Sequence, residues 1–86
     1  MYKIEFSHLA AKELDKIYKT DKKLYSRFIT VIKTLGTNPY QGKRLKGKLA
    51  GDYSLRLSDY RIIYTIHEAR LIIYVIDLGH RRDIYK

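Results

Sequence analysis

Two arginines in the second half of the chain have the residue type and spacing for binding a phosphate. Arg56 and Arg61 flank Ser58 and Asp59, a pair of residues typical of a tight turn. If that turn joins two antiparallel strands, both guanidinium groups can converge on one anion, which a guanidinium binds bidentately. The alternative is that each arginine pairs with a local carboxylate, Asp52 or Asp59, and has a purely structural role.

The end of the chain adds a titratable group, further cations and an aromatic ring. His80 precedes Arg81 and Arg82, and its imidazole ionises near neutral pH without help, so it is the candidate proton carrier. Tyr85 either anchors the tail or stacks on a nucleobase, a contact worth roughly 1–3 kcal/mol. Together with the arginine pair, these residues could hold a phosphate and stack a base.

The composition restricts the class of protein. A chain of 86 residues suits one domain, residues 1–86, and an apolar fraction of 45% favours a folded chain. Eighteen Lys and Arg residues against nine Asp and Glu give a net charge of +9, which predicts a nucleic acid or an acidic protein as partner. Without cysteine, and with three scattered histidines, the chain lacks the ligand spacing of a metal site. We expect no metal, no cofactor and no membrane partner, and a cytoplasmic location.

The first half of the chain predicts a strand followed by two helices. Residues 2–6 alternate apolar and polar side chains, as a strand with one buried face does. An apolar stripe then predicts a helix over residues 8–18, with Ser7 as its N-cap. A second helix is expected to begin after the cap Asp21 and to end at Gly36.

The second half predicts an antiparallel meander. Its strands are expected over residues 53–57, 60–66 and 71–78, joined by short turns. The last of them is apolar almost throughout, which is typical of a central strand covered on both faces. We therefore predict an α+β fold of order β-α-α-β-β-β, in which the N-terminal strand and a two-helix hairpin pack on an antiparallel sheet.

Residues 40–52 are predicted to form a basic loop between the helices and the meander. Such a glycine-punctuated loop is usually only solvated, yet so long a connection in a compact domain is uncommon unless it is functional. We therefore predict that its cations contact RNA or a partner; they are Lys43, Arg44, Lys46 and Lys48.

An ordered set of features resembles the RelE/ParE superfamily of toxins from type II toxin–antitoxin systems. It consists of a strand ending in Phe-Ser, two helices, a basic loop, the motif G-x-Y-x-L-R-x-x-x-Y-R-I-x-Y and a terminal G-H-R-R-x-x-Y. The resemblance covers essentially the whole chain. It implies a RelE-like enzyme that enters the ribosomal A site and cuts the messenger RNA there, by attack of an RNA 2′-OH on the adjacent phosphate without a metal.

The resemblance also implies roles for individual residues. Arg61 matches the strand arginine that stabilises the pentacoordinate phosphate, and Arg81 the arginine that protonates the leaving 5′-oxygen. Tyr85 matches the tyrosine that stacks on the attacked nucleotide. Arg56 falls where the family's archetype has the second of two strand lysines, and Ser54 falls where it has the first.

The serine at position 54 departs from the family pattern, because a serine cannot replace a cation. Either general-base catalysis and phosphate binding are shared by Arg56, His80 and the loop lysines, or this member of the family cuts RNA less efficiently. Arginine, with a pKa above about 12, is a poor base, so His80 is the preferred group for proton transfer.

The expected partners also follow from the resemblance. They are a RelB-like antitoxin, the ribosome and messenger RNA, and the toxin–antitoxin complex is expected to bind operator DNA through the antitoxin. A competing hypothesis is a ParE-like toxin that poisons DNA gyrase, although Tyr85 together with Arg56 and Arg61 favours the RelE-like activity. A third is a basic binding module without activity.

Overall fold

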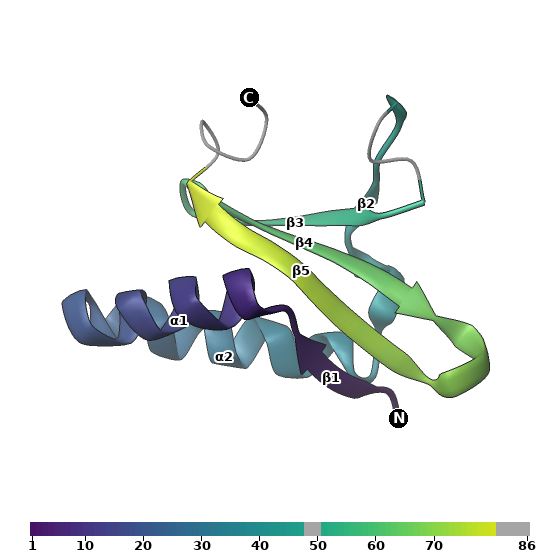
Figure 1. Ribbon diagram of the computed structural model, residues 1–86, viewed down its shortest axis with the longest axis horizontal. Coiled ribbons are helices and arrows are strands. Elements are labelled where there is room, and N and C mark those ends of the chain that lie inside the picture. Colours follow the sequence, from purple (N-terminus) through teal and green to yellow (C-terminus); the bar gives the residue numbers. More distant parts are fainter. Residues whose placement is uncertain (48–50, 81–86) are drawn as a thin grey trace.

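The computed structural model describes residues 1–47 and 51–80 (Figure 1). This part of the chain contains two α-helices and a five-stranded sheet of order β1-β5-β4-β3-β2. Both helices lie on one side of the sheet, so the fold has two layers (Figure 1). In chain order the elements are β1 (Lys3–Phe6), α1 (His8–Thr20), α2 (Lys22–Leu35), β2 (Lys43–Arg44), β3 (Tyr53–Leu57), β4 (Tyr60–His67) and β5 (Ile72–His80).

The predicted helix caps are confirmed. The Oγ of Ser7 accepts a hydrogen bond from the Ala10 amide at 3.0 Å, and the carboxylate of Asp21 accepts one from the Leu24 amide at 3.1 Å. Each bond satisfies a backbone donor that the first turn of a helix leaves open. The second helix ends before Gly36 as predicted, but this glycine keeps a right-handed conformation with φ −62°.

The α+β fold is confirmed, and the structure adds the position of the N-terminal strand. Strand β1 lies at the edge of the sheet and pairs in parallel with β5, from Lys3 opposite Ile72 to Phe6 opposite Val75. The sheet is therefore mixed, whereas the sequence predicts an antiparallel one. The predicted interior position of the last strand is correct, because β5 lies between β1 and β4.

The prediction of an uninterrupted loop over residues 40–52 is wrong. A 3₁₀ helix spans Pro39–Gln41, and β2 then pairs antiparallel with β3, with Lys43 opposite Ser54 and Arg44 opposite Tyr53. A strand of two residues is too short to show an alternating pattern, so its pairing becomes visible only in the folded chain.

The core lies between the helices and one face of the sheet. The alternation predicted for β3 and β4 is confirmed. The odd-numbered apolar residues of β3 and the even-numbered apolar residues of β4 pack against the apolar stripes of the helices on that face. The residues with the largest fully buried side chains are Phe28, Leu35, Ile62, Tyr64, Ile73, Val75 and Leu78.

Tyr64 ties the segment before β2 to this core. Its ring is fully buried, and its hydroxyl donates to the Pro39 carbonyl at 2.8 Å and accepts from the Gly42 amide at 3.0 Å. Burial raises the pKa of this hydroxyl above its usual value. A Cβ at position 42 would lie 2.5 Å from the hydroxyl oxygen, so the close approach requires glycine.

We predict that Tyr64→Phe lowers the free energy of unfolding by about 1–3 kcal/mol, because two buried backbone groups lose their partner. Urea unfolding monitored by circular dichroism measures this loss. The matched control is Tyr40→Phe, which deletes the same atom from a ring that is 53% exposed and should leave stability nearly unchanged. Equal stabilities for the two variants would contradict the anchoring role of Tyr64.

Candidate functional site

The hairpin of β3 and β4 brings the two predicted site arginines together. Arg56 lies directly opposite Arg61, and the next pair, Leu57 and Tyr60, closes on a two-residue turn. Ser58, the first residue of the turn, has a φ of 56°, in the left-handed region that two-residue hairpin turns use. The strand pairing that the sequence predicts is therefore present.

Both arginines lie on the sheet face opposite the helices. Their neighbours Leu55 and Ile62 pack toward the core, and successive side chains of a strand point to opposite faces. Arg56 is exposed, whereas Arg61 is half-buried and its Nε is enclosed. Within residues 1–47 and 51–80, Arg56 forms no ion pair with Asp52 or with Asp59.

The pairing of these arginines costs stability, because like charges directly opposite one another on two strands repel. The hairpin would be more stable with an opposite charge or a neutral residue at either position. A shared anion between the guanidinium groups of Arg56 and Arg61 would offset the repulsion, which is the arrangement that a phosphate site needs.

Register places a third cation on the same face. Lys43 of β2 is exposed and lies opposite Ser54, which is two residues before Arg56 on β3. Residues that pair across strands share a face, as do residues two apart on one strand. Lys43, Arg56 and Arg61 therefore form a row of cations across β2, β3 and β4, which we call the cationic row.

Ser54, at the position where the family pattern has a lysine, is only 4% exposed. A lysine there would have to extend from a covered position, whereas the exposed Lys43 is carried by the neighbouring strand. On the other side of the cationic row, Arg61 lies opposite Gly79, so no side chain of β5 stands beside it at that position.

The remaining predicted residues have different outcomes. The last strand, predicted to end at residue 78, continues through His80, whose backbone pairs with Tyr60 beside the hairpin turn. Arg44 is exposed on β2, and Lys46 is exposed two residues after the end of that strand. Four predicted residues lie outside the part of the chain that the structure describes; they are Lys48, Arg81, Arg82 and Tyr85.

Asp77 is a titratable residue near the site that the sequence analysis did not select. It lies on β5 opposite Ile63, close to Arg61 along the neighbouring strand. Burial raises the pKa of its carboxyl, the Leu78 amide opposes this by hydrogen bonding, and the charge of Glu13 raises the pKa further. The available signal was an acidic residue within an otherwise apolar strand.

We predict that the free energy of unfolding of Asp77→Asn, relative to that of the wild type, increases as the pH rises from 4 to 7. A raised pKa in the folded state means that the folded protein binds the proton more tightly than the unfolded chain does. The wild type therefore loses stability as the pH rises through the folded-state pKa, and asparagine removes this loss. Urea unfolding of both proteins across this pH range checks the prediction, and a pH-independent difference would contradict it.

Two further properties concern metals and membranes. In the described ranges, no group of three or more His, Cys, Asp or Glu side chains is arranged to hold a metal ion. Among the same residues, no helix has both the length and the apolar character needed to cross a membrane.

This chain is similar to known proteins in its sequence. A family model described as the ParE toxin of type II toxin–antitoxin system, parDE, matches residues 4–85. Toxin YoeB of Synechocystis sp. is 34% identical over 76 residues, which are 83% of this chain and 88% of that protein. A putative RelE-like toxin protein of Escherichia coli is 32% identical over 88 residues, covering 98% of this chain and 90% of that protein.

The fold has solved counterparts. A chain of the toxin–antitoxin complex RelBE2 from Mycobacterium tuberculosis superimposes with a TM-score of 0.82 at 26% identity, covering 93% of this chain and 98% of that chain.

Proposed function

Because the chain belongs to the RelE/ParE superfamily of toxins of type II toxin–antitoxin systems, we propose that it is a ribosome-dependent endoribonuclease that cuts messenger RNA in the A site. The observation that carries this proposal is the pair of arginines, Arg56 and Arg61, held opposite one another on the face of the sheet that the helices leave open. Binding one phosphate relieves the repulsion between them.

The proposed reaction is an internal transfer within the RNA. The 2′-oxygen forms a bond to the adjacent phosphorus, the bond from phosphorus to the 5′-oxygen breaks, and the products are a 2′,3′-cyclic phosphate and a 5′-hydroxyl. Negative charge grows on the phosphate oxygens in the transition state. Arg56 and Arg61 stabilise that charge, and Lys43 adds a further cation on the same face.

Proton transfers complete the reaction. We assign the removal of the 2′-OH proton to His80, whose backbone pairs with Tyr60 next to the hairpin turn. Arg81 donates a proton to the leaving 5′-oxygen, and Tyr85 stacks on the attacked nucleotide.

The proposed partners follow from the charge and from the family. We propose that the cations around β2 and the chain end contact the ribosome and the message; these residues are Lys43, Arg44, Lys46, Lys48 and Arg82. A RelB-like antitoxin is the proposed inhibitor, a proposal supported by the similar toxin in the RelBE2 complex. The complex would bind operator DNA through the antitoxin.

A second candidate function is inhibition of DNA gyrase. The observation that favours it is the family model, whose description names the ParE toxin. A supercoiling assay with purified gyrase, run beside the cleavage assay on programmed ribosomes, separates the two functions. Inhibited supercoiling without cleavage would replace the endoribonuclease proposal, and neither activity would leave a basic binding module.

We predict that the purified toxin cleaves messenger RNA within the A-site codon of a programmed ribosome in the presence of a chelator such as EDTA. Mg²⁺ would be added in excess over the EDTA to keep the ribosome intact, so the chelator removes transition metals such as Zn²⁺, which it binds far more tightly than Mg²⁺. Mass spectrometry of the fragments should show 2′,3′-cyclic or 3′-phosphate ends and 5′-hydroxyl ends. Fragments with 5′-phosphate ends would overturn the proposed chemistry.

Arg61→Ala and Arg56→Ala should each lower the single-turnover cleavage rate by about 10²-fold or more, the amount lost when one donor to a developing charge is removed. Arg70→Ala is the matched control, because Arg70 is exposed on the short 3₁₀ helix before β5 and lies outside the site. Circular dichroism establishes that all three variants are folded. A wild-type cleavage rate in folded Arg61→Ala would contradict the proposed role of Arg61.

His80→Gln tests the proposed proton transfer. Glutamine retains hydrogen bonding but does not titrate, so the single-turnover rate should lose its dependence on an ionisation near the ordinary histidine value of about 6.5. An unchanged rate and pH profile would remove His80 from the mechanism and leave a basic residue such as Lys43 as the candidate.

A further inference from the structure

A groove runs between α2 and the turn that joins β3 to β4. Its larger hollow, of about 470 Å³, is lined by Asp21, Lys23, Leu24, Arg27, Ser58 and Tyr60. A second hollow, of about 300 Å³, continues along α2 past Ser26 and Thr30 and shares Arg27 with the first. We call the two together the α2 groove.

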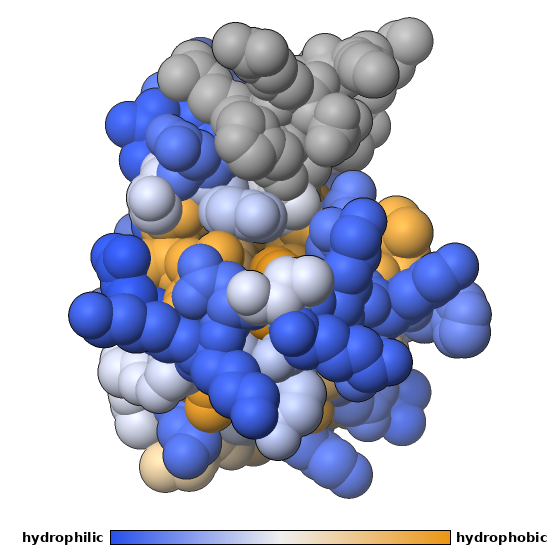
Figure 2. All heavy atoms as spheres, turned by 90° about the vertical axis from the view of Figure 1, so that its left-hand side faces the viewer, coloured by the Kyte–Doolittle hydropathy of each residue, from blue (hydrophilic) through white to orange (hydrophobic). Residues whose placement is uncertain are grey.

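The α2 groove combines an apolar floor with a cationic and hydroxylic rim. Leu24, Leu57 and Tyr60 supply apolar surface, and the Tyr60 ring is held edge to face against Phe28 with centroids 5.5 Å apart. Figure 2 views the molecule from the end where α2 begins, and there hydrophilic side chains surround a patch of hydrophobic ones. Such a surface can pack a nucleobase and hold its phosphate at the rim.

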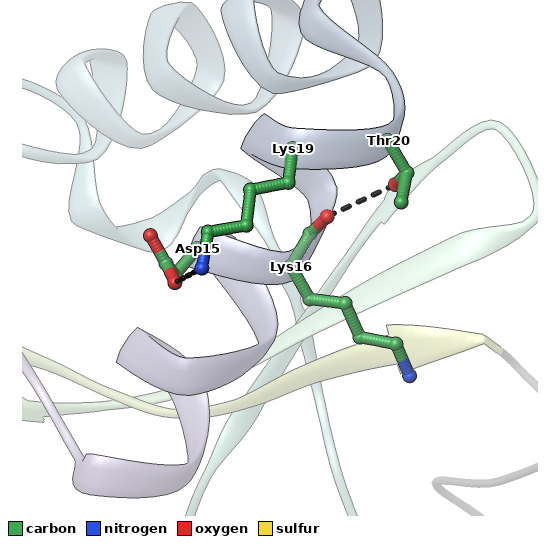
Figure 3. A network of polar contacts seen from close by, with 4 residues as sticks. All are labelled: Asp15, Lys16, Lys19 and Thr20. Atoms are coloured by element: carbon green, nitrogen blue, oxygen red, sulfur yellow. Dashed lines mark hydrogen bonds and ion pairs between the residues drawn. The ribbon is translucent and has the colours of Figure 1, made fainter.

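The rim of the groove carries more positive than negative charge, because Lys23 and Arg27 line it with one carboxylate, Asp21. Asp21, the acidic residue of the groove, accepts the Leu24 amide as the cap of α2. Lys19, in the preceding turn, is bound to Asp15 at 3.2 Å (Figure 3). Lys23 and Arg27 form no ion pair with any residue in the described ranges, so both are available to an anion.

The α2 groove borders the hairpin turn that carries the proposed cleavage site. Ser58 lines the groove and belongs to the turn that Arg56 and Arg61 flank. The arginines lie on the open face of the sheet, and the groove lies on the helix side of the same turn. A strand of RNA bound at the arginines therefore reaches the groove by passing round the end of the hairpin.

We propose that the α2 groove is a subsite for a nucleotide of the message that neighbours the cleaved bond. Lys23 and Arg27 bind its backbone phosphate, and the base packs on the floor that Leu24 and Tyr60 form. This subsite rests on the proposed endoribonuclease function. It identifies the flanking single-stranded RNA as part of what the toxin binds.

The test measures how RNA affinity depends on salt. Fluorescence anisotropy would follow binding of a labelled hexanucleotide that carries a 2′-deoxy group at the cleaved position. For single strands, each phosphate contact contributes about 0.7 to the slope of log K against log salt, so Lys23→Gln with Arg27→Gln, which removes the contact to one phosphate, should reduce the slope by about 0.7. A trinucleotide that fills only the cleavage site should bind the wild type and this double variant equally.

The matched control is Lys12→Gln with Lys16→Gln, which removes the same charge from exposed positions on α1 outside the groove. Figure 3 shows the Lys16 side chain directed away from the Asp15–Lys19 pair. This control should bind the hexanucleotide with a slope closer to that of the wild type. Circular dichroism should show both double variants folded.

The outcomes separate the subsite from the proposed function. Equal slopes for the two folded double variants would overturn the subsite, even if the wild type cleaves ribosome-bound message. Absence of cleavage by the wild type, with a reduced slope in the groove variant, would overturn the proposed chemistry and retain the subsite. If the groove variant keeps its RNA slope but loses affinity for an acidic antitoxin peptide, the groove is a protein-docking surface and the subsite is wrong.

Discussion

The register of the β3–β4 hairpin is the constraint on which the rest of the structure depends. Because side chains alternate along a strand, a slip by one residue would expose Leu55 and Ile62 and turn the arginines into the core. The apolar burial on one face therefore holds Arg56 and Arg61 together on the other. Their repulsion is tolerated because the core offsets it, and the left-handed Ser58 sets the turn that makes this register possible.

The buried side chain of Tyr64 extends the site beyond the hairpin. Through its two hydrogen bonds the buried Tyr64 holds the backbone on both sides of the short 3₁₀ helix, and the chain then enters β2. That placement puts Lys43 opposite Ser54 and completes the cationic row. The charged residues are thus positioned by buried groups, and they can be exposed without losing their arrangement.

Local signals explain which parts of this arrangement could be predicted from the sequence. The caps Ser7 and Asp21 and the alternation along β3 and β4 depend on residues within a few positions of one another, so they are readable. The parallel pairing of β1 with β5, the two-residue strand β2 and the α2 groove depend on residues far apart in the chain. Periodicity carries no information about such contacts, so the sequence predicts the α+β order of the elements but not these long-range pairings.

The cationic row also suggests why an acidic segment is enough to inhibit a toxin of this kind. A fold does not by itself determine a function. Like charges that lie opposite one another on adjacent strands lower the stability of a sheet. On the proposed function, an anion bound between Arg56 and Arg61 would offset this repulsion, and that anion would be either a phosphate of the message or a carboxylate of the antitoxin. The substrate and the inhibitor would therefore be bound by the same electrostatic attraction to these two arginines. An acidic segment that reaches this face excludes RNA by occupying it, without any change in the fold.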